Sequence, residues 1–367
     1  MREEVLYELA LSFVPSLGPV GIKDLMQELG SAKEVFFASK PQLQKVSGIG
    51  PIIAKNIKST DYLALAEKEM KFCEDKHIDI LSYFHSEHFP HNLKNCYDSP
   101  VILYHIGNVH SDKRLHVGIV GTRDASEYGK KVCVELVKTL APYNPIIVSG
   151  LAMGIDYEAH RQALRSGLDT IAIVAHGLDT VYPREHYNIA LEIVKQGAII
   201  TEFGKGIKPN RENFPARNRI IAGICNVIVV VEAKEKGGAL ITADIANSYG
   251  RDVFTFPGRI FDKRSAGCNN LIKQNVASII THPNDIVQAL GLELKTPVSI
   301  QKSMFVELSA IEQQLIDTMV SYEHPVEFDD LLRANSLSFG QISNLLLGLE
   351  IKGIIRAMPG KKFEVII

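Results

Sequence analysis

Seven short runs of β-branched and other apolar residues recur between residues 115 and 282, and their spacing is the feature that most constrains the fold. The runs lie at 115–121, 144–150, 169–177, 197–202, 226–233, 252–256 and 277–282. Segments with the apolar spacing of amphipathic helices, such as 130–140 and 157–167, separate them. Strands that are apolar throughout are typical of a parallel sheet covered by helices on both faces. The pattern therefore predicts an α/β, Rossmann-like, doubly wound parallel sheet over residues 76–295.

A helical domain of the helix-hairpin-helix or SAM-like type is predicted before the sheet, at residues 1–75. Two segments there, "VPSLGPVGIKDLM" (14–26) and "VSGIGPIIAKNI" (46–57), each place a glycine turn before a helix. Such turns can hold a DNA phosphate at a helix N-terminus. Few lysines or arginines flank them, so a packing role is the alternative.

After the sheet we expect a linker at 296–307 and a winged helix at 308–367. The latter combines three helical segments with a hairpin at a Pro-Gly turn. Its expected recognition helix carries only Lys352 and Arg356 near the end. This shortage of basic residues favours a protein–protein role over the reading of duplex DNA.

Charge and cysteine usage limit the possible partners. The formal net charge is −2, so any binding of nucleic acid must use a local patch and not the bulk charge. The five cysteines contain no C-x-x-C pair, which argues against a zinc site and a disulfide framework. We find no signal-peptide pattern and no apolar run of bilayer length. The sequence therefore predicts a cytoplasmic protein with no metal and no membrane partner.

The loops that follow the predicted strands concentrate glycine, hydroxyl and arginine residues. They lie at 118–129, 149–156, 214–223 and 232–243. In doubly wound folds these loops meet at the carboxyl edge of the sheet, where glycines and helix N-termini accept anions. The side chains that we expect to converge there are Arg123, Arg217, Asn218, Arg219 and Lys236. Several phosphates in a row explain such a group better than one.

Motifs for common nucleotide chemistry are missing. The first loop reads Gly-x-x-Gly-x-Arg and not G-x-G-x-x-G, and no G-x-x-x-x-G-K-[ST] occurs. We therefore expect no cofactor. Asp156, His160 and Glu202 could form an acid–base set, but no nucleophile accompanies them, and a structural role is favoured. No catalytic residue is assigned, and we expect no enzyme activity.

The motifs together resemble those of the DNA-processing protein A family (DprA, also called Smf). They are "GIVGTR", "SGLAMGIDYEAHRQAL", "HGLDTVYP", "FPARNRIIAG", "EAKEKGGALITA" and "FPG…GCNNLI", in this order. The sequence departs from the family pattern at Lys236-Gly237-Gly238, where a Ser-Gly is common, at Thr201, and at Gln274-Asn275-Val276. The resemblance implies a protein that binds single-stranded DNA without sequence preference, protects incoming strands in natural transformation and loads the RecA recombinase. It also implies a homodimer formed through the Rossmann-like domain.

The resemblance and the loop chemistry together define the candidate DNA-binding residues. These are Gly121, Thr122, Arg123, Ser149, Gly150, Gly154, Arg217, Asn218, Arg219, Lys236, Gly237, Gly238 and Thr242. Arg217 and Arg219 are two positions apart on a helix and point about 200° away from each other. We therefore expect one to bind DNA and the other to pair with an acidic residue, and Arg123 is the first choice for a direct contact.

Two other functions stay open. One is a nucleotide hydrolase of the phosphoribohydrolase type, which uses a similar Gly-Gly loop followed by a threonine and a glutamate. Here Ala243 and Asp244 follow Thr242 in place of that glutamate. The other is a nucleotide-sensing module that signals through the winged helix.

Overall fold

A computed structural model of the chain describes residues 2–108, 114–292, 308–322, 325–335, 337–352, 354–358 and 362–365. The chain forms two compact units, Met1–Leu294 and Lys295–Ile367. The predicted linker at 296–307 lies outside the described residues.

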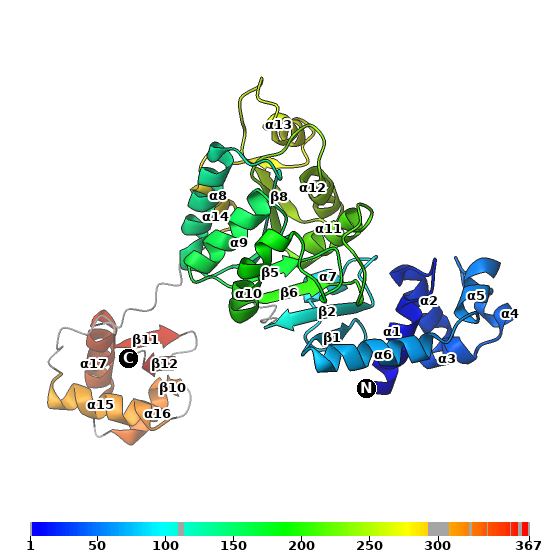
Figure 1. Cartoon of the computed structure of the whole chain (residues 1–367). Coiled ribbons are helices and arrows are strands. Elements are labelled where there is room, and N and C mark those ends of the chain that lie inside the picture. The colour runs from blue at the N-terminus through cyan, green and yellow to red at the C-terminus, as the bar shows by residue number, and fades with distance from the viewer. Residues whose placement is uncertain are drawn as a thin grey trace. The chain divides into compact units, whose positions relative to one another are not determined.

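The first unit is built on a mostly parallel sheet (Figure 1). Its strands in the described residues are β1 (Asp79–Ser82), β2 (Ile102–Gly107), β3 (His116–Val120), β4 (Ile146–Ser149), β5 (Thr170–Ile173), β6 (Ala198–Thr201), β7 (Val227–Val230), β8 (Asp252–Thr255) and β9 (Ser278–Ile279). They are ordered β1-β2-β6-β5-β4-β3-β7-β8-β9, and each of the seven predicted runs contains one of them. In this sheet the pairs β1–β2 and β2–β6 are antiparallel, and the other pairs are parallel. The predicted fold class is confirmed.

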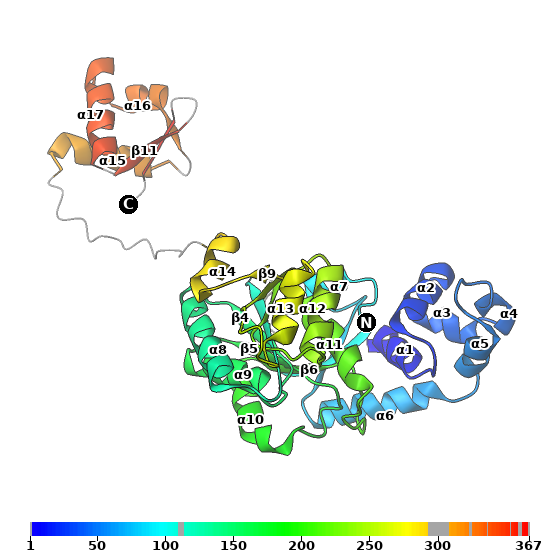
Figure 2. The same ribbon diagram turned by 90° about the horizontal axis from the view of Figure 1, so that it is seen from above.

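Helices cover both faces of this sheet because neighbouring residues of each strand point to opposite sides. They are α7 (His91–Lys94), α8 (Glu127–Leu140), α9 (Ile155–Arg165), α10 (Tyr187–Gln196), α11 (Asn213–Ile224), α12 (Gly238–Ser248), α13 (Ala266–Lys273) and α14 (Pro283–Ala289). Ile147 packs with α8, α9 and α14, whereas its neighbour Val148 packs with α7, α11, α12 and α13. Figure 2 shows α8 and α9 on one side of the strands and α11 to α13 on the other.

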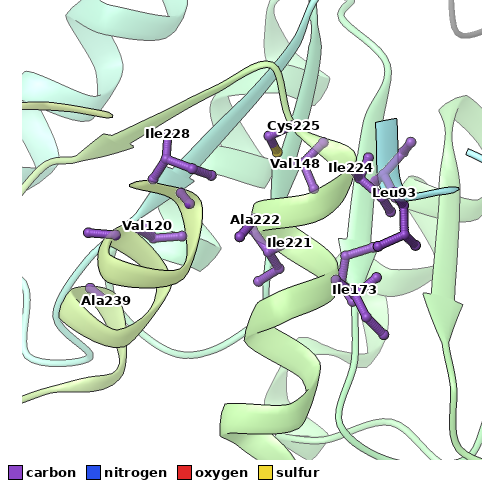
Figure 3. Packing of buried hydrophobic residues seen from close by; sticks show 14 of the residues in the cluster. Leu93, Val120, Val148, Ile173, Ile221, Ala222, Ile224, Cys225, Ile228 and Ala239 are labelled. Carbon is purple, nitrogen blue, oxygen red and sulfur yellow. The ribbon is translucent and has the colours of Figure 1, made fainter. Parts of the chain in front are cut away.

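The face under α11 and α12 positions the loops discussed below. Val120, Val148 and Ile228 from the sheet lie against Ile221 and Ala239 from these helices, as Figure 3 shows. All of these side chains are buried. The apolar stripe of α11 is therefore fixed on the sheet, which sets where the polar residues Arg217, Asn218 and Arg219 of this helix point.

Residues before the sheet form the helices α1 (Arg2–Ser12), α2 (Pro19–Leu29), α3 (Ala32–Phe37), α4 (Lys40–Leu43), α5 (Pro51–Ile57) and α6 (Tyr62–Asp75). Gly18 and Gly50 stand at the starts of α2 and α5, each followed by a proline at the first helical turn. The apolar residues of these helices share a core with Ile102 and Tyr104 of β2. This helical segment is thus packed onto the edge of the sheet within the same compact unit.

The second unit is a winged helix, as predicted. Its helices are α15 (Ala310–Val320), α16 (Phe328–Ala334) and α17 (Phe339–Ile351), and its strands are β10 (Val326–Glu327), β11 (Ile355–Met358) and β12 (Lys362–Val365), in the order β10-β12-β11. Leu315, Leu331 and Ile342 contribute one buried side chain from each helix to its core. The sequence of α17 contains no lysine or arginine. In the described part of the chain, no helix has the length and apolarity needed to cross a membrane.

Candidate nucleic-acid interface

Three neighbouring strands end beside a pocket of about 270 Å³. Because β4, β3 and β7 are adjacent and parallel, their carboxyl ends bring the loops after them together. Many of the candidate residues line the pocket, namely Gly121, Thr122, Arg123, Arg217, Asn218, Lys236, Gly237, Gly238 and Thr242. The remaining candidates, Ser149, Gly150, Gly154 and Arg219, do not line it.

The loop between β3 and α8 is held in place by Glu232, which the sequence analysis did not select. The Thr122 amide donates to the Glu232 carbonyl at 2.7 Å. The Glu232 carboxylate accepts from the Ser126 amide at 2.8 Å and from the Ser126 hydroxyl at 2.7 Å. A buried carboxylate beneath the loop therefore fixes the backbone that carries Arg123. Only its position at the end of an apolar run marks Glu232 in the sequence.

The first turn of α12 opens toward the pocket. Gly237 is its N-cap, and no side chain caps the helix. The Gly238 carbonyl accepts from Asn218 Nδ2 and from Thr242 Oγ1, each at 3.1 Å. These bonds fix the start of the helix, and the Leu240 amide donates to the Gly237 carbonyl at 3.2 Å, whereas the amides of Gly238 and Ala239 have no hydrogen-bond partner among the described residues. Free amides and the positive end of the helix dipole favour an anion at this place.

Arg217 lies beneath the pocket and is only 4% exposed. Its Nη1 donates to the Gly150 carbonyl at 2.6 Å and to the Ile173 carbonyl, and its Nε donates to Asn218 Oδ1 at 3.2 Å. The two N–H groups of Nη2 have no hydrogen-bond partner among the described residues. They can donate to an anion in the pocket that Arg217 lines.

Arg217 and Asp156 are both buried and carry opposite charges, and each opposes the shift that burial imposes on the pKa of the other, although no direct salt bridge joins them in the described residues. Burial lowers the pKa of the Arg217 guanidinium to about 10, and the Asp156 carboxylate opposes that change. Burial raises the pKa of Asp156, which the charge of Arg217 opposes in turn. At neutral pH the guanidinium therefore stays charged, and the floor of the pocket carries a positive charge close to a carboxyl group.

Two cations at the rim have no acidic partner. Arg123 and Lys236 are exposed, and neither forms an ion pair in the part of the chain that the structure describes. The Arg123 guanidinium lies over the Phe214 ring, with its Cζ 4.8 Å from the ring centroid. Lys234 differs from both, since its Nζ is 3.1 Å from Asp124 Oδ2. Arg123 and Lys236 are thus the rim charges that are free to meet an anion.

Arg219 faces away from the pocket and pairs with an acidic residue. Its Nη2 donates to the Glu202 carboxylate, and its Nη1 donates to the Asp98 carbonyl. Burial raises the pKa of Glu202, and Arg219 opposes this shift. Of the two arginines in "FPARNR", Arg217 is the one that reaches the pocket.

The other candidates outside the pocket shape the loops around it. Ser149 is buried and donates to the Ile119 carbonyl at 2.6 Å. Gly154 has a φ of +82°, and a Cβ there would lie 2.2 Å from the Thr122 carbonyl oxygen. Gly150 contacts Arg217, because a Cβ at this position would meet Arg217 Nη1 at 2.2 Å. These three residues allow the close packing on which the pocket is built.

The acid–base set considered from the sequence is not assembled around the pocket. His160 is fully buried, its Nδ1 is 2.7 Å from Thr170 Oγ1, and burial lowers its pKa to about 3. Glu202 is bonded to Arg219, and only Asp156 lines the pocket. Within the described residues, no group of three or more His, Cys, Asp or Glu side chains could hold a metal ion.

The similarity of the chain to known proteins identifies its family. Residues 80–291, more than half of the chain, match the family model described as DNA recombination-mediator protein A. The chain belongs to this family. The model described as the DprA winged helix domain matches residues 306–361.

Relatives of the DNA recombination-mediator protein A family extend over most of the chain. Protein Smf from Synechocystis sp. is 32% identical over 401 residues and covers 99% of both chains. DNA processing protein DprA from Streptococcus pneumoniae is 41% identical over 199 residues, which are 54% of this chain and 70% of that protein. The resemblance seen in the sequence motifs is therefore confirmed.

Two solved structures of the DNA recombination-mediator protein A family share the fold. The X-ray structure of DprA from Streptococcus pneumoniae has a TM-score of 0.66 and 33% identity, and covers 77% of this chain and 95% of that one. DNA processing protein A from Helicobacter pylori has a TM-score of 0.52 and 30% identity, over 58% of this chain and 95% of that one. The latter structure concerns the single-stranded DNA binding mode of that protein.

Proposed function

We propose that the protein binds single-stranded DNA without sequence preference, with backbone phosphates held at the pocket on the carboxyl edge of the sheet. The observation that carries this proposal is the pairing of two free rim cations, Arg123 and Lys236, with the uncapped start of α12. Beneath them, Arg217 keeps two donors for the same anion. Arginine, lysine and helix amides are the usual phosphate partners in nucleic-acid complexes.

Contacts of this kind read the backbone and not the bases. The pocket is lined by charged side chains, by glycines at a helix start and by the Phe214 ring, over which the Arg123 guanidinium lies. An extended single strand can pass its phosphates along adjacent strand ends, while its bases point away or stack on nearby side chains. Such binding supports a sequence-independent role in DNA processing, as the names of the relatives suggest.

The wider role that we propose follows from the family. The protein would protect incoming single strands during natural transformation or recombination and load RecA recombinase onto them, acting in the cytoplasm as a homodimer through its Rossmann-like domain. It would do so as a binding protein and not as an enzyme. The separation of His160 and Glu202 from the pocket supports this choice.

Fluorescence anisotropy with labelled oligonucleotides of several lengths tests this function. Single strands should bind more tightly than duplexes of the same length, and homopolymers of different bases should bind alike at one salt concentration. Preference for duplexes, or for one base sequence, would contradict the proposal.

A nucleotide hydrolase of the phosphoribohydrolase type is the second candidate, supported by the Gly-Gly loop at the start of α12. Ala243 and Asp244 follow Thr242, so the glutamate of such enzymes has no counterpart. A nucleotide-sensing module is the third. Release of free base from nucleoside monophosphates would favour the hydrolase. Tight binding of a mononucleotide that single-stranded DNA does not displace would favour the sensor.

A further inference from the structure

A short basic loop between β8 and α13 exposes two large apolar side chains. Ile260 is 81% exposed and Phe261 is 93% exposed, which makes them the most exposed large hydrophobic residues in the described ranges. The helix α13 that follows the loop lies at the top of Figure 1. Leaving such groups in water is unfavourable, so an exposed apolar pair at a loop tip calls for an explanation.

Internal hydrogen bonds hold this loop in a defined shape. At its base, the Gly258 amide donates to Asn269 Oδ1 and Asn269 Nδ2 donates to the Gly258 carbonyl, each at 3.1 Å. Within it, the Asp262 amide donates to the Arg259 carbonyl at 3.0 Å, and the Arg264 amide donates to Asp262 Oδ1 at 2.9 Å. The tip is therefore preorganised, and a ligand that met it would lose little affinity to ordering of the loop.

The loop adjoins the phosphate pocket. Arg264 Nη2 is 3.1 Å from Asp124 Oδ2, and Lys234 Nζ, from the pocket lining, is 3.1 Å from the same oxygen. Asp124 directly follows Arg123 in the chain. The parent strands β3, β7 and β8 are neighbours, so the ends of β3 and β8 are about 10 Å apart, at about 4.8 Å for each strand spacing.

The charge around the apolar tip is positive. Arg259 and Lys263 form no ion pair with any described residue, and they flank Ile260 and Phe261 on either side. Asp262 lies between them, and its carboxylate accepts from the Arg264 amide within the loop. A polyanion that carries flat apolar rings matches this combination of cations and an exposed aromatic ring.

We propose that Phe261, supported by Ile260, is a stacking platform for a base of the single strand whose phosphate occupies the neighbouring pocket. This inference rests on the proposed function and adds a contact to the bases. Stacking on an aromatic ring accepts every base, so it strengthens binding without adding sequence preference.

A protein partner fits the tip less well than a base. Stable protein interfaces bury about 800 Å² on each side, whereas the tip offers only two apolar side chains among cations. A single base needs no more than one aromatic face. We therefore assign the tip to DNA, and a role in protein assembly becomes an outcome of the test.

The test measures the affinity of full-length Phe261→Ala for a thymidine oligonucleotide and for an abasic deoxyribose-phosphate oligomer of the same length. We expect about a tenfold loss for the thymidine strand and little change for the abasic strand. Phe261→Trp should retain the wild-type affinity. The matched control is Phe37→Ala, since Phe37 of α3 is also strongly exposed, at 74%, but lies in the helical segment.

Three results would overturn the inference while leaving the proposed function intact. These are wild-type affinity of Phe261→Ala, an equal loss on both oligomers, and a changed sedimentation behaviour of Phe261→Ala with unchanged DNA binding. If the wild-type protein binds neither oligomer, the proposed function fails. Failure of the stacking inference and failure of the proposed function are therefore distinguishable.

Discussion

Replacement of Arg217 by alanine should destabilise the first unit severely. The substitution leaves the carbonyls of Gly150 and Ile173 without their donor and leaves Asp156 buried without its counter-charge. Leaving two buried carbonyls without their donor and a buried carboxylate without the opposing charge costs about 3–5 kcal/mol of unfolding free energy. Each kcal/mol lowers Tm by about 2–4 °C in domains of about 150–250 residues, and the larger first unit lies at the lower end of this range. The expected decrease in Tm is therefore about 6–10 °C.

The loss should depend on pH, with a sign set by Asp156. Burial raises the folded-state pKa of Asp156 above its ordinary 3.8, so its ionisation costs stability as the pH rises through the raised value. Arg217 opposes that shift in the wild type, and its removal makes the cost larger. The deficit of Arg217→Ala should therefore be full at neutral pH and should shrink as the pH falls toward 3.8.

Thermal unfolding followed by circular dichroism from neutral to mildly acidic pH measures this deficit. Arg217→Ala combined with Asp156→Asn should recover part of the lost stability, because the uncompensated charge is gone. A wild-type Tm for Arg217→Ala, a deficit that grows on acidification, or no recovery in the double variant would refute the reasoning.

Three further predictions follow from the same geometry. Gly154→Ala should lower the unfolding free energy by at least about 1 kcal/mol and weaken DNA binding. The reason is that the φ of Gly154 is +82° and a Cβ there would meet the Thr122 carbonyl. An unchanged urea denaturation curve would contradict this prediction. A chain that ends after residue 292 should keep the single-strand affinity of the whole protein, because the residues that line the pocket lie within 120–242. A large loss of affinity in the anisotropy assay would implicate the winged helix. Nucleoside monophosphates should yield no free base by chromatography, and turnover that is lost in Glu202→Gln would establish an enzyme.

The parallel part of the sheet could be predicted because its strands are apolar throughout, which leaves a clear signal in the sequence. The strands β1 and β2 were not among the predicted runs. The first, "DILS", is short and partly exposed, and both pair antiparallel at the edge of the sheet. The second, "ILYHIG", is mostly buried, with Leu103 in the core of the sheet and Ile102 and Tyr104 in the core of the helical segment, so its antiparallel pairing and not its burial sets it apart from the predicted runs.

The convergence of the loops was also predictable, because parallel strands end at the same edge. The partners of individual side chains were not. Helical geometry separated Arg217 from Arg219, but only the fold places Glu202 beside Arg219 and Phe214 beneath Arg123. Glu232 organises a loop more than a hundred residues earlier in the chain, and spacing along the sequence carries no sign of that contact.

The salt dependence of single-strand affinity in Arg123→Ala tests the central claim most directly. The matched control is Arg165→Ala, which removes an exposed arginine with the same change in net charge. Arg165 is the last residue of α9, whereas Asp156 in the first turn of α9 lines the pocket. Arg123→Ala should weaken binding by about 1–3 kcal/mol, equally for all homopolymers. The slope of log affinity against log salt should decrease by about 0.7 for one lost phosphate contact. Arg165→Ala should match the wild type. If both variants bind and respond to salt alike, with the fold intact, the phosphates are not held at this pocket.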